Sequence, residues 1–285
     1  GHPWQNVDLV LMHTNASPRQ LVGVSSAVEI EVWDRVRLLL SLFTSHASSL
    51  EARLQVRIAR MLSDRTVLRE LANQQTTGER AGYGGGGITA LQATIANINR
   101  ELVQLRKRQK KHAVAQSERR KQRSRSGAVT VGLAGYTNAG KSSLFLALSG
   151  KDVLVRDKLF STLETTIGRM EDSPRVLLAD TIGFIDHLPS STLDAFRATL
   201  AEALECDLLL ILSDVSDAPE ELERKLFTSR NEIFSRFYGE EIEDDFPWNS
   251  NETSNVQKVL TVLTKKDQAT EMQLDEAIAT VAALG

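Results

Sequence analysis

The sequence predicts an α/β fold, in which a P-loop domain follows a small α/β segment and an antiparallel helical hairpin. Three observations predict it. Strand, loop and helix patterns alternate after residue 128, two long helical patterns flank a glycine-rich stretch before it, and strand-like runs open the chain. We therefore divide the 285 residues into segments 1–32, 33–127 and 128–285, which suits one large domain or two ordinary ones.

Composition narrows the class of protein. Hydrophobic residues make up 41% and charged residues 25% of the chain, as in globular proteins with a packed core. The single cysteine, Cys206, excludes internal disulfides and zinc sites built from cysteines. No apolar run approaches the roughly 20 residues needed to cross a bilayer, so we expect no membrane partner.

Charge is distributed unevenly along the chain. Residues 1–128 carry 20 basic and 10 acidic side chains, a balance of +10, whereas residues 129–285 carry 14 and 27, a balance of −13. The two halves give the net charge of −3. This asymmetry predicts that the basic half binds a polyanion.

The first 127 residues read as short strands followed by two helices. Strand-like runs at 7–12 and 28–32 flank a turn-prone stretch at 15–18. Apolar residues then recur at helical spacing, at Leu50, Leu54, Ile58, Met61 and Leu68. After a glycine-rich break at 78–87, a second apolar seam runs through Leu91, Ile95, Ile98, Leu102 and Leu105. Two helices with facing seams predict a hairpin with a glycine-rich tip.

The second helix of this hairpin ends in a strongly basic run. Residues 103–126 contain ten basic side chains and one acid, so ion pairing within the helix cannot explain them. A solvated helix face is the simplest interpretation, but binding to phosphate backbones explains the single sign better. The residues predicted to bind RNA in this run are Arg106, Lys107, Arg108, Lys110, Lys111, Arg119, Arg120 and Lys121.

The glycine-rich tip has two interpretations. It is either a flexible linker or a tip whose bare backbone approaches RNA closely. The second interpretation assigns RNA contacts to Gly84, Gly85, Gly86 and Gly87.

From residue 128 onward the pattern is typical of buried parallel strands. Apolar runs at 129–134, 176–179, 208–212 and 259–263 predict four strands. Residues 238–255 are acidic and polar, as expected of a surface insertion.

A phosphate-binding loop follows the first of these strands. Residues 135–142 fit the pattern G-x-x-x-x-G-K-S between a strand and a helix, where glycines turn backbone N–H groups toward phosphate oxygens. Lys141 is expected to contact the β- and γ-phosphates, and Ser142 to bind Mg²⁺. The nucleotide-binding residues predicted here are Asn138, Ala139, Gly140, Lys141, Ser142 and Ser143.

Two further motifs follow strands in the order that a GTP site needs. Asp180 and Gly183, in a D-x-x-G pattern, are expected to hold Mg²⁺ and to sense the γ-phosphate. Residues 264–267 read T-K-K-D, in which the Asp267 carboxylate can accept two hydrogen bonds from guanine and the Lys265 stem can lie along the base. Adenine offers no such donor pair. The chain from 128 is therefore predicted to be a P-loop GTPase domain that binds GTP and Mg²⁺.

The first switch must supply a threonine to Mg²⁺ and the γ-phosphate. Its candidates lie within 160–167, and we favour Thr166 over Thr165. The predicted catalytic residues are thus Lys141, Thr166 and Gly183, and the predicted metal ligands are Ser142, Thr166 and Asp180.

Residues 135–145, 180–189 and 195–202 together resemble the HflX family of ribosome-associated GTPases. The resemblance extends upstream through 32–61 and the glycine-rich tip, although 85–92 reads GGGITALQ where the family usually has GPGETQLE. It implies a GTPase that binds rRNA and proteins of the large ribosomal subunit, as a monomer, with the hairpin tip directed to the peptidyl transferase centre. It also implies a last guanine-contacting loop beyond Gly285.

The resemblance bears on turnover at two positions. Phe184 stands where many GTPases have the glutamine that orients the attacking water, so we expect slow hydrolysis that a partner accelerates. Asn138 resembles the asparagine that coordinates K⁺ beside the phosphates in related GTPases; a loop-stabilising amide is the equal alternative.

Late assembly of the large subunit is the function this sequence favours. Splitting or rescue of assembled ribosomes and a GTP-gated scaffold with little turnover are the alternatives. The departures from bacterial patterns, the acidic insertion and the first residue, Gly1, favour the mitochondrial matrix, with the bacterial cytoplasm as the alternative.

Overall fold

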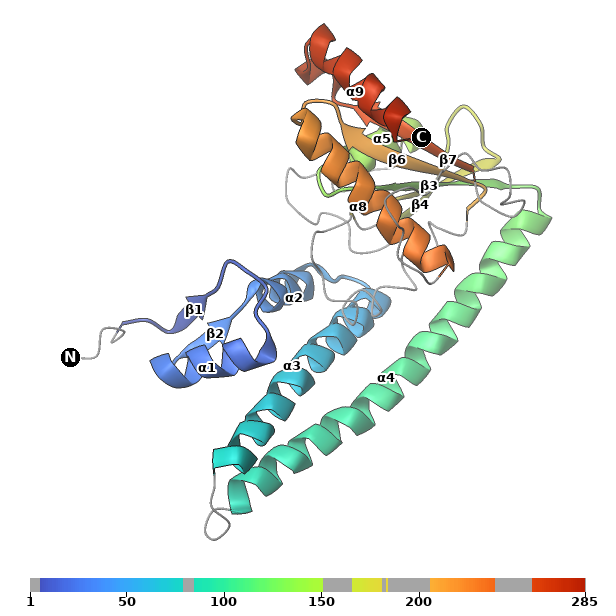
Figure 1. Cartoon of the computed structure of the whole chain (residues 1–285). Coiled ribbons are helices and arrows are strands. Elements are labelled where there is room, and N and C mark those ends of the chain that lie inside the picture. The colour runs from blue at the N-terminus through green and yellow to red at the C-terminus, as the bar shows by residue number, and fades with distance from the viewer. Residues whose placement is uncertain are drawn as a thin grey trace. The chain divides into compact units, whose positions relative to one another are not determined.

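The computed structural model describes residues 6–78, 85–150, 166–180, 183, 206–238 and 258–284 (Figure 1). These residues group into two compact units, one up to Ala115 and one from Gln116 onward. The long helix α4 (Gly85–Arg125) passes through the boundary. The three-part division at 32/33 and 127/128 stays a prediction.

The first unit opens with a small parallel sheet. Strands β1 (Leu9–Leu11) and β2 (Glu31–Trp33) pair directly with each other, and helix α1 (Pro18–Val28) connects them along the chain. The turn expected at 15–18 is a helix start instead, because Ser17 and Gln20 form a capping box just before and within the first turn. Helix α1 therefore occupies much of the span between the expected strands, and β2 begins later than 28–32 implied.

Three helices complete the first unit. Helix α2 (Arg35–His46) is capped by Asp34, whose Oδ1 accepts from the Arg37 N–H at 2.8 Å. Helix α3 (Leu50–Gly78) and helix α4 form the predicted antiparallel hairpin (Figure 1), linked by an Arg57–Glu101 ion pair.

The apolar seams of the hairpin are largely as predicted. Leu54 and Ile58 of α3 are buried, as are Leu102 and Leu105 of α4. Leu50 is an exception at 73% exposed, because it is the first residue of its helix and lies beyond the packed face.

The second unit is built on a five-stranded sheet of order β4-β5-β3-β6-β7. Its strands are β3 (Val129–Gly135), β4 (Thr166–Arg169), β5 (Val176–Asp180), β6 (Leu208–Asp214) and β7 (Lys258–Thr264). All neighbours are parallel except β4, which runs antiparallel to β5 at the edge. The four predicted strands are present, whereas β4 was not expected to be a strand.

Helices cover this sheet from two directions. Helix α5 (Lys141–Ser149) packs on β3, β4 and β5, and helix α8 (Pro219–Tyr238) packs on β6 and β3 (Figure 1). Helix α9 (Glu271–Ala283) lies beside α8 and follows a short 3₁₀ turn, η1 (Lys266–Gln268). The core contains fully buried Leu133, Phe145, Leu209 and Leu226. The predicted α/β fold with a P-loop domain behind a helical hairpin is confirmed.

Several predicted features fall outside the described residues. They are Gly84, the first-switch residues up to Thr165, Phe184 and nearly all of the acidic insertion. Gly85, Gly86 and Gly87 lie in the first turn of α4 rather than in a loop. Within the part of the chain that the structure describes, no helix has the length and apolar character of a membrane span.

Candidate nucleotide site

The loop between β3 and α5 has the backbone shape that the phosphate motif requires. Gly135 (φ 136°), Asn138 (φ 65°) and Gly140 (φ 82°) all take positive φ values, which turn the chain sharply. A side chain at Gly135 would collide with the Leu212 carbonyl of β6, so the loop lies directly against the sheet. Helix α5 then starts at Lys141, which places its N-terminal N–H groups at the loop.

Lys141 is buried in the mouth of this loop. Only 6% of the residue is exposed, and its Nζ donates a hydrogen bond to the Tyr136 carbonyl at 2.6 Å. Burial lowers the pKa of Lys141 to about 8, although the nearby Asp180 carboxylate acts in the opposite direction. A phosphate beside Lys141 Nζ would offset this effect of burial and favour the charged ammonium.

Two oxygens suited to Mg²⁺ meet beside this lysine. The Ser142 Oγ donates to Oδ2 of Asp180 at 2.8 Å, and Asp180, the last residue of β5, is fully buried. Both are hard oxygen donors, the type that Mg²⁺ prefers, so the residues present fit the metal. Among the described residues no cluster of three His, Cys, Asp or Glu offers another metal site.

Thr166 is paired with Asp180 in the sheet. It is the first residue of β4 and stands opposite Asp180 in the antiparallel register. Opposed residues of an antiparallel pair point to the same face of the sheet. Its role as a ligand stays a prediction.

Gly183 lies on the other side of the lysine. A Cβ at this position would be 2.8 Å from Lys141 Nζ and 2.8 Å from the Thr137 amide nitrogen. Only glycine fits such an approach, and the contact places the backbone of Gly183 against the phosphate loop.

The base-binding loop is joined to the phosphate loop by Thr264. Its hydroxyl lies 3.0 Å from the Ala139 carbonyl and 3.0 Å from the Ser213 carbonyl. Threonine thus connects the two loops, although asparagine is usual at this position in such motifs. The next residue, Lys265, adopts φ 58° and turns the chain into η1, where Asp267 is exposed.

Two functional candidates were not predicted from the sequence. Lys265 Nζ contacts Oδ2 of Asp214 at 2.5 Å; burial raises the pKa of Asp214, but hydrogen bonds from Lys265 and Ser216 outweigh it and hold the pKa below its usual value. Asp214 ends β6 as Asp180 ends β5, and that shared signal could have identified it.

Tyr136 is the second candidate, at a position that the motif leaves open. The Cζ atom of Arg224 lies 5.5 Å from the centre of its ring, and Lys225 Nζ lies 5.7 Å from it. These contacts tie the phosphate loop to α8.

The predicted site residues are thus brought together in most cases. Lys141, Ser142, Asp180, Gly183 and the Ala139–Gly140 turn converge at one end of the sheet, while Asn138 and Ser143 are exposed at its rim. None of the contacts described above involves the eight predicted RNA-binding residues of α4. All eight are exposed except Arg120, which is half-buried.

Comparison with known proteins agrees with this geometry. A family model described as "50S ribosome-binding GTPase" matches residues 130–237. GTPase HflX of Methanocaldococcus jannaschii is 35% identical over 233 residues, covering 81% of this chain and 57% of the relative. GTPase HflX of Gluconacetobacter diazotrophicus is 40% identical over 212 residues, covering 74% and 46%.

The chain belongs to the HflX family of GTPases. The resemblance identified from the sequence motifs is therefore confirmed. The chain spans about half the length of the HflX relatives it matches. A crystal structure of SsGBP with GDP is similar in fold, with a TM-score of 0.51 and 23% identity over 99% of this chain and 74% of that one.

Proposed function

We propose that this protein is a slow GTPase that docks on the large ribosomal subunit through the basic part of α4 and acts in late subunit assembly. The proposal rests on membership of the HflX family and on the convergence of Lys141, Ser142, Asp180 and Gly183 around one phosphate loop. Of these, the contact of Gly183 with Lys141 is the observation that carries it, because it joins the second switch to the phosphate-binding cation.

Each residue of the site has a distinct role in this proposal. The Lys141 ammonium and the N–H groups of the loop bind the β- and γ-phosphates, and the Gly183 N–H contacts the γ-phosphate. Ser142, Asp180 and Thr166 would hold Mg²⁺, which supplies positive charge to the phosphate oxygens when bound. The exposed amide of Asn138 would bind K⁺ at the rim of the loop.

Slow turnover is proposed from the residue after Gly183. The chain has Phe184 where many GTPases have a glutamine, and a phenyl ring cannot orient the attacking water. A ribosomal partner would then have to order the attacking water.

Ribosome docking is proposed from the charge of α4. The run 103–126 has ten basic residues against Glu118, and the ion pair that Glu118 makes with Lys121, at 3.4 Å, is exposed on both sides. Exposed pairs of this kind contribute little, so this pair does not offset the charge that would attract RNA phosphates. The family description "50S ribosome-binding GTPase" supports the same partner.

Docking is assayed by loading the protein with GTP or GDP and measuring its co-sedimentation with purified large subunits. Reversing Lys110 and Lys111 to glutamate should abolish binding while nucleotide affinity is unchanged. The control reverses Arg19 and Lys258, exposed residues in other elements, and has the same change in net charge. Binding that survives in the α4 variant, or that ignores the nucleotide, would refute the proposal.

Two further measurements separate the alternatives. GTP hydrolysis with and without subunits, in K⁺ and in Na⁺ buffer, distinguishes a GTPase from a scaffold and tests the role of Asn138. Binding to assembly intermediates rather than to mature ribosomes distinguishes assembly from rescue. We place this activity in the mitochondrial matrix; imaging of the tagged full-length protein tests that location.

A further inference from the structure

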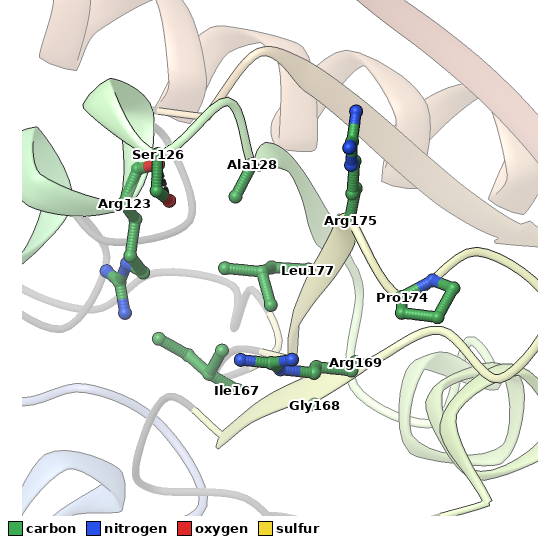
Figure 2. A pocket seen from close by; sticks show the side chains of 9 residues that line it. All are labelled: Arg123, Ser126, Ala128, Ile167, Gly168, Arg169, Pro174, Arg175 and Leu177. Carbon is green, nitrogen blue, oxygen red and sulfur yellow. Dashed lines mark hydrogen bonds between the residues drawn. The ribbon is translucent and has the colours of Figure 1, made fainter.

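A cavity of about 520 Å³ opens at the edge of the sheet in the second unit (Figure 2). It lies where the last turn of α4, the start of β3, the edge strand β4 and its neighbour β5 meet, and none of its lining residues belongs to the nucleotide site. Three arginines line it, namely Arg123, Arg169 and Arg175, together with the apolar side chains of Ile167 and Leu177. Its volume is in the range of about 300–1,000 Å³ that is usual for ligand sites.

The charge of this cavity is of one sign. None of the described residues that line it is acidic. The side chains of Arg169 and Arg175 make no ion pair or hydrogen bond with any described residue, and both are exposed. Two acids, Glu171 and Asp172, lie in the turn between Arg169 and Arg175, but neither lines the cavity, and the Glu171 carboxylate lies beside Gly150 at the end of α5.

The side chains are arranged to act together. Figure 2 shows Arg123 and Arg169 on opposite sides of Ile167 and Leu177, while Arg175 lies at the rim with its guanidinium group turned away from these side chains. Guanidinium groups that converge on one hollow repel one another, so an anion between them would relieve the repulsion.

Backbone contacts set the positions of all three arginines. The Arg123 carbonyl accepts from the Ser126 Oγ at 2.6 Å and from the Ser126 N–H at 3.1 Å, which fixes the end of α4. The Arg175 carbonyl accepts from the Val129 N–H at 2.9 Å, and Arg169 stands opposite Leu177 in the β4–β5 ladder. These contacts bring the three arginines together from the end of α4, from β4 and from the residue before β5.

We propose that this cavity binds the phosphodiester backbone of RNA, and the proposal rests on the ribosome docking argued above. A planar guanidinium group can donate two parallel hydrogen bonds to two oxygens of one phosphate, and the apolar side chains of Ile167 and Leu177 can contact a sugar or base. RNA is favoured over a free phosphate compound because Arg123 continues the basic run of α4. Exposed Arg119 and Lys121 precede it in the same unit, so a strand bound along the helix would lead into the cavity.

The test uses the full chain and a fluorescein-labelled single-stranded RNA of 12 nucleotides, titrated over a series of salt concentrations. The variant Arg169→Ala/Arg175→Ala removes two phosphate contacts, so the slope of log K against log salt should fall by about 1.4. If the two proteins bind RNA equally at 1 M salt, the double variant should bind about 25-fold more weakly than the unaltered protein at 0.1 M salt. The control, Lys258→Ala, removes an exposed charge from β7 at the opposite edge of the same sheet and should change the slope far less.

Three outcomes are informative. A lower slope and weaker RNA binding in the double variant alone support the proposal. Unchanged RNA binding overturns it, and so does an effect confined to competition by inorganic phosphate or GMP, which would indicate a site for small phosphate compounds. Binding to large subunits is measured in parallel. If the unaltered protein ignores subunits, ribosome docking fails, while the 12-nucleotide RNA still tests the cavity separately.

Discussion

Replacing Thr264 by valine should weaken the connection between the phosphate loop and the base loop. Valine has nearly the shape of threonine but no hydroxyl, so the contacts to the carbonyls of Ala139 and Ser213 are lost without creating a cavity. The single hydroxyl proton is shared between two acceptors, so the loss is that of about one hydrogen bond plus partly desolvated carbonyls, about 1–2 kcal/mol.

This magnitude predicts two measurable changes. For a domain of this size, 1 kcal/mol lowers Tm by about 2–4 °C, so thermal unfolding should shift by about 2–8 °C. Up to about 1.4 kcal/mol of the loss would appear in GDP affinity, which is about tenfold in Kd. A fluorescent GDP analogue measures the affinity, and a matching ADP analogue shows whether base selectivity falls as well.

Two further variants sharpen this test. Thr130→Val makes the same chemical change in β3, where the hydroxyl has no hydrogen bond with described residues, and should leave GDP affinity unchanged. Thr264→Asn offers two N–H donors for the two carbonyls and should retain GDP affinity. If Thr264→Val binds GDP as tightly as the unaltered protein and unfolds at the same temperature, the connection does not matter and the reasoning fails.

Three other predictions concern the same site. Phosphate binding favours the charged ammonium of Lys141, whose pKa is lowered to about 8, so GDP affinity should be fully present below pH 8 and fall by up to tenfold per pH unit above it. GMP has no β-phosphate, so its affinity should not fall in this way. A GDP affinity that does not change with pH would contradict the role of Lys141. Asp267→Asn should lose guanine affinity and gain xanthine affinity in competition binding, and unchanged GTP affinity would refute the base-reading role. Gly183→Ala should weaken GTP binding by about 5- to 150-fold, because its methyl group must displace Lys141 or the backbone at Thr137 at a cost of about 1–3 kcal/mol. Wild-type GTP affinity in a direct titration would show that the loop shifts without cost.

Most of the second unit could be predicted because its strands are buried. Parallel strands covered on both faces read as continuous apolar runs, so 129–134 and 208–212 stand out without further information. Strand β4 has only four residues, contains Gly168 and lies at the sheet edge, so neither length nor pattern distinguishes it from a loop.

The first unit shows a different limit. Proline after serine suggests a turn, yet Pro18 is the first residue of α1, where its missing N–H costs nothing and Ser17 provides the cap. The glutamine three residues later was the sign of a helix start. Local rules conflicted, and the capping box prevailed.

Within the nucleotide site, motifs predicted residue types but not long-range partners. The hydrogen bond from Thr264 to Ala139 joins residues 125 positions apart. The contact of Lys265 with Asp214 depends on β6 and β7 ending side by side. Such pairs follow from sheet order, which periodicity alone does not determine.

Strand β4 carries residues of both proposed sites, Thr166 for the nucleotide site and Arg169 for the arginine-lined cavity. Side chains alternate along a strand, so Thr166 and Gly168 share the face that meets α5, while Arg169 points the other way. Separating a four-residue edge strand from its sheet requires less free energy than separating most other parts of the sheet. Separation of β4 from β5 would move Thr166 away from Asp180 and Arg169 away from its cavity in a single movement.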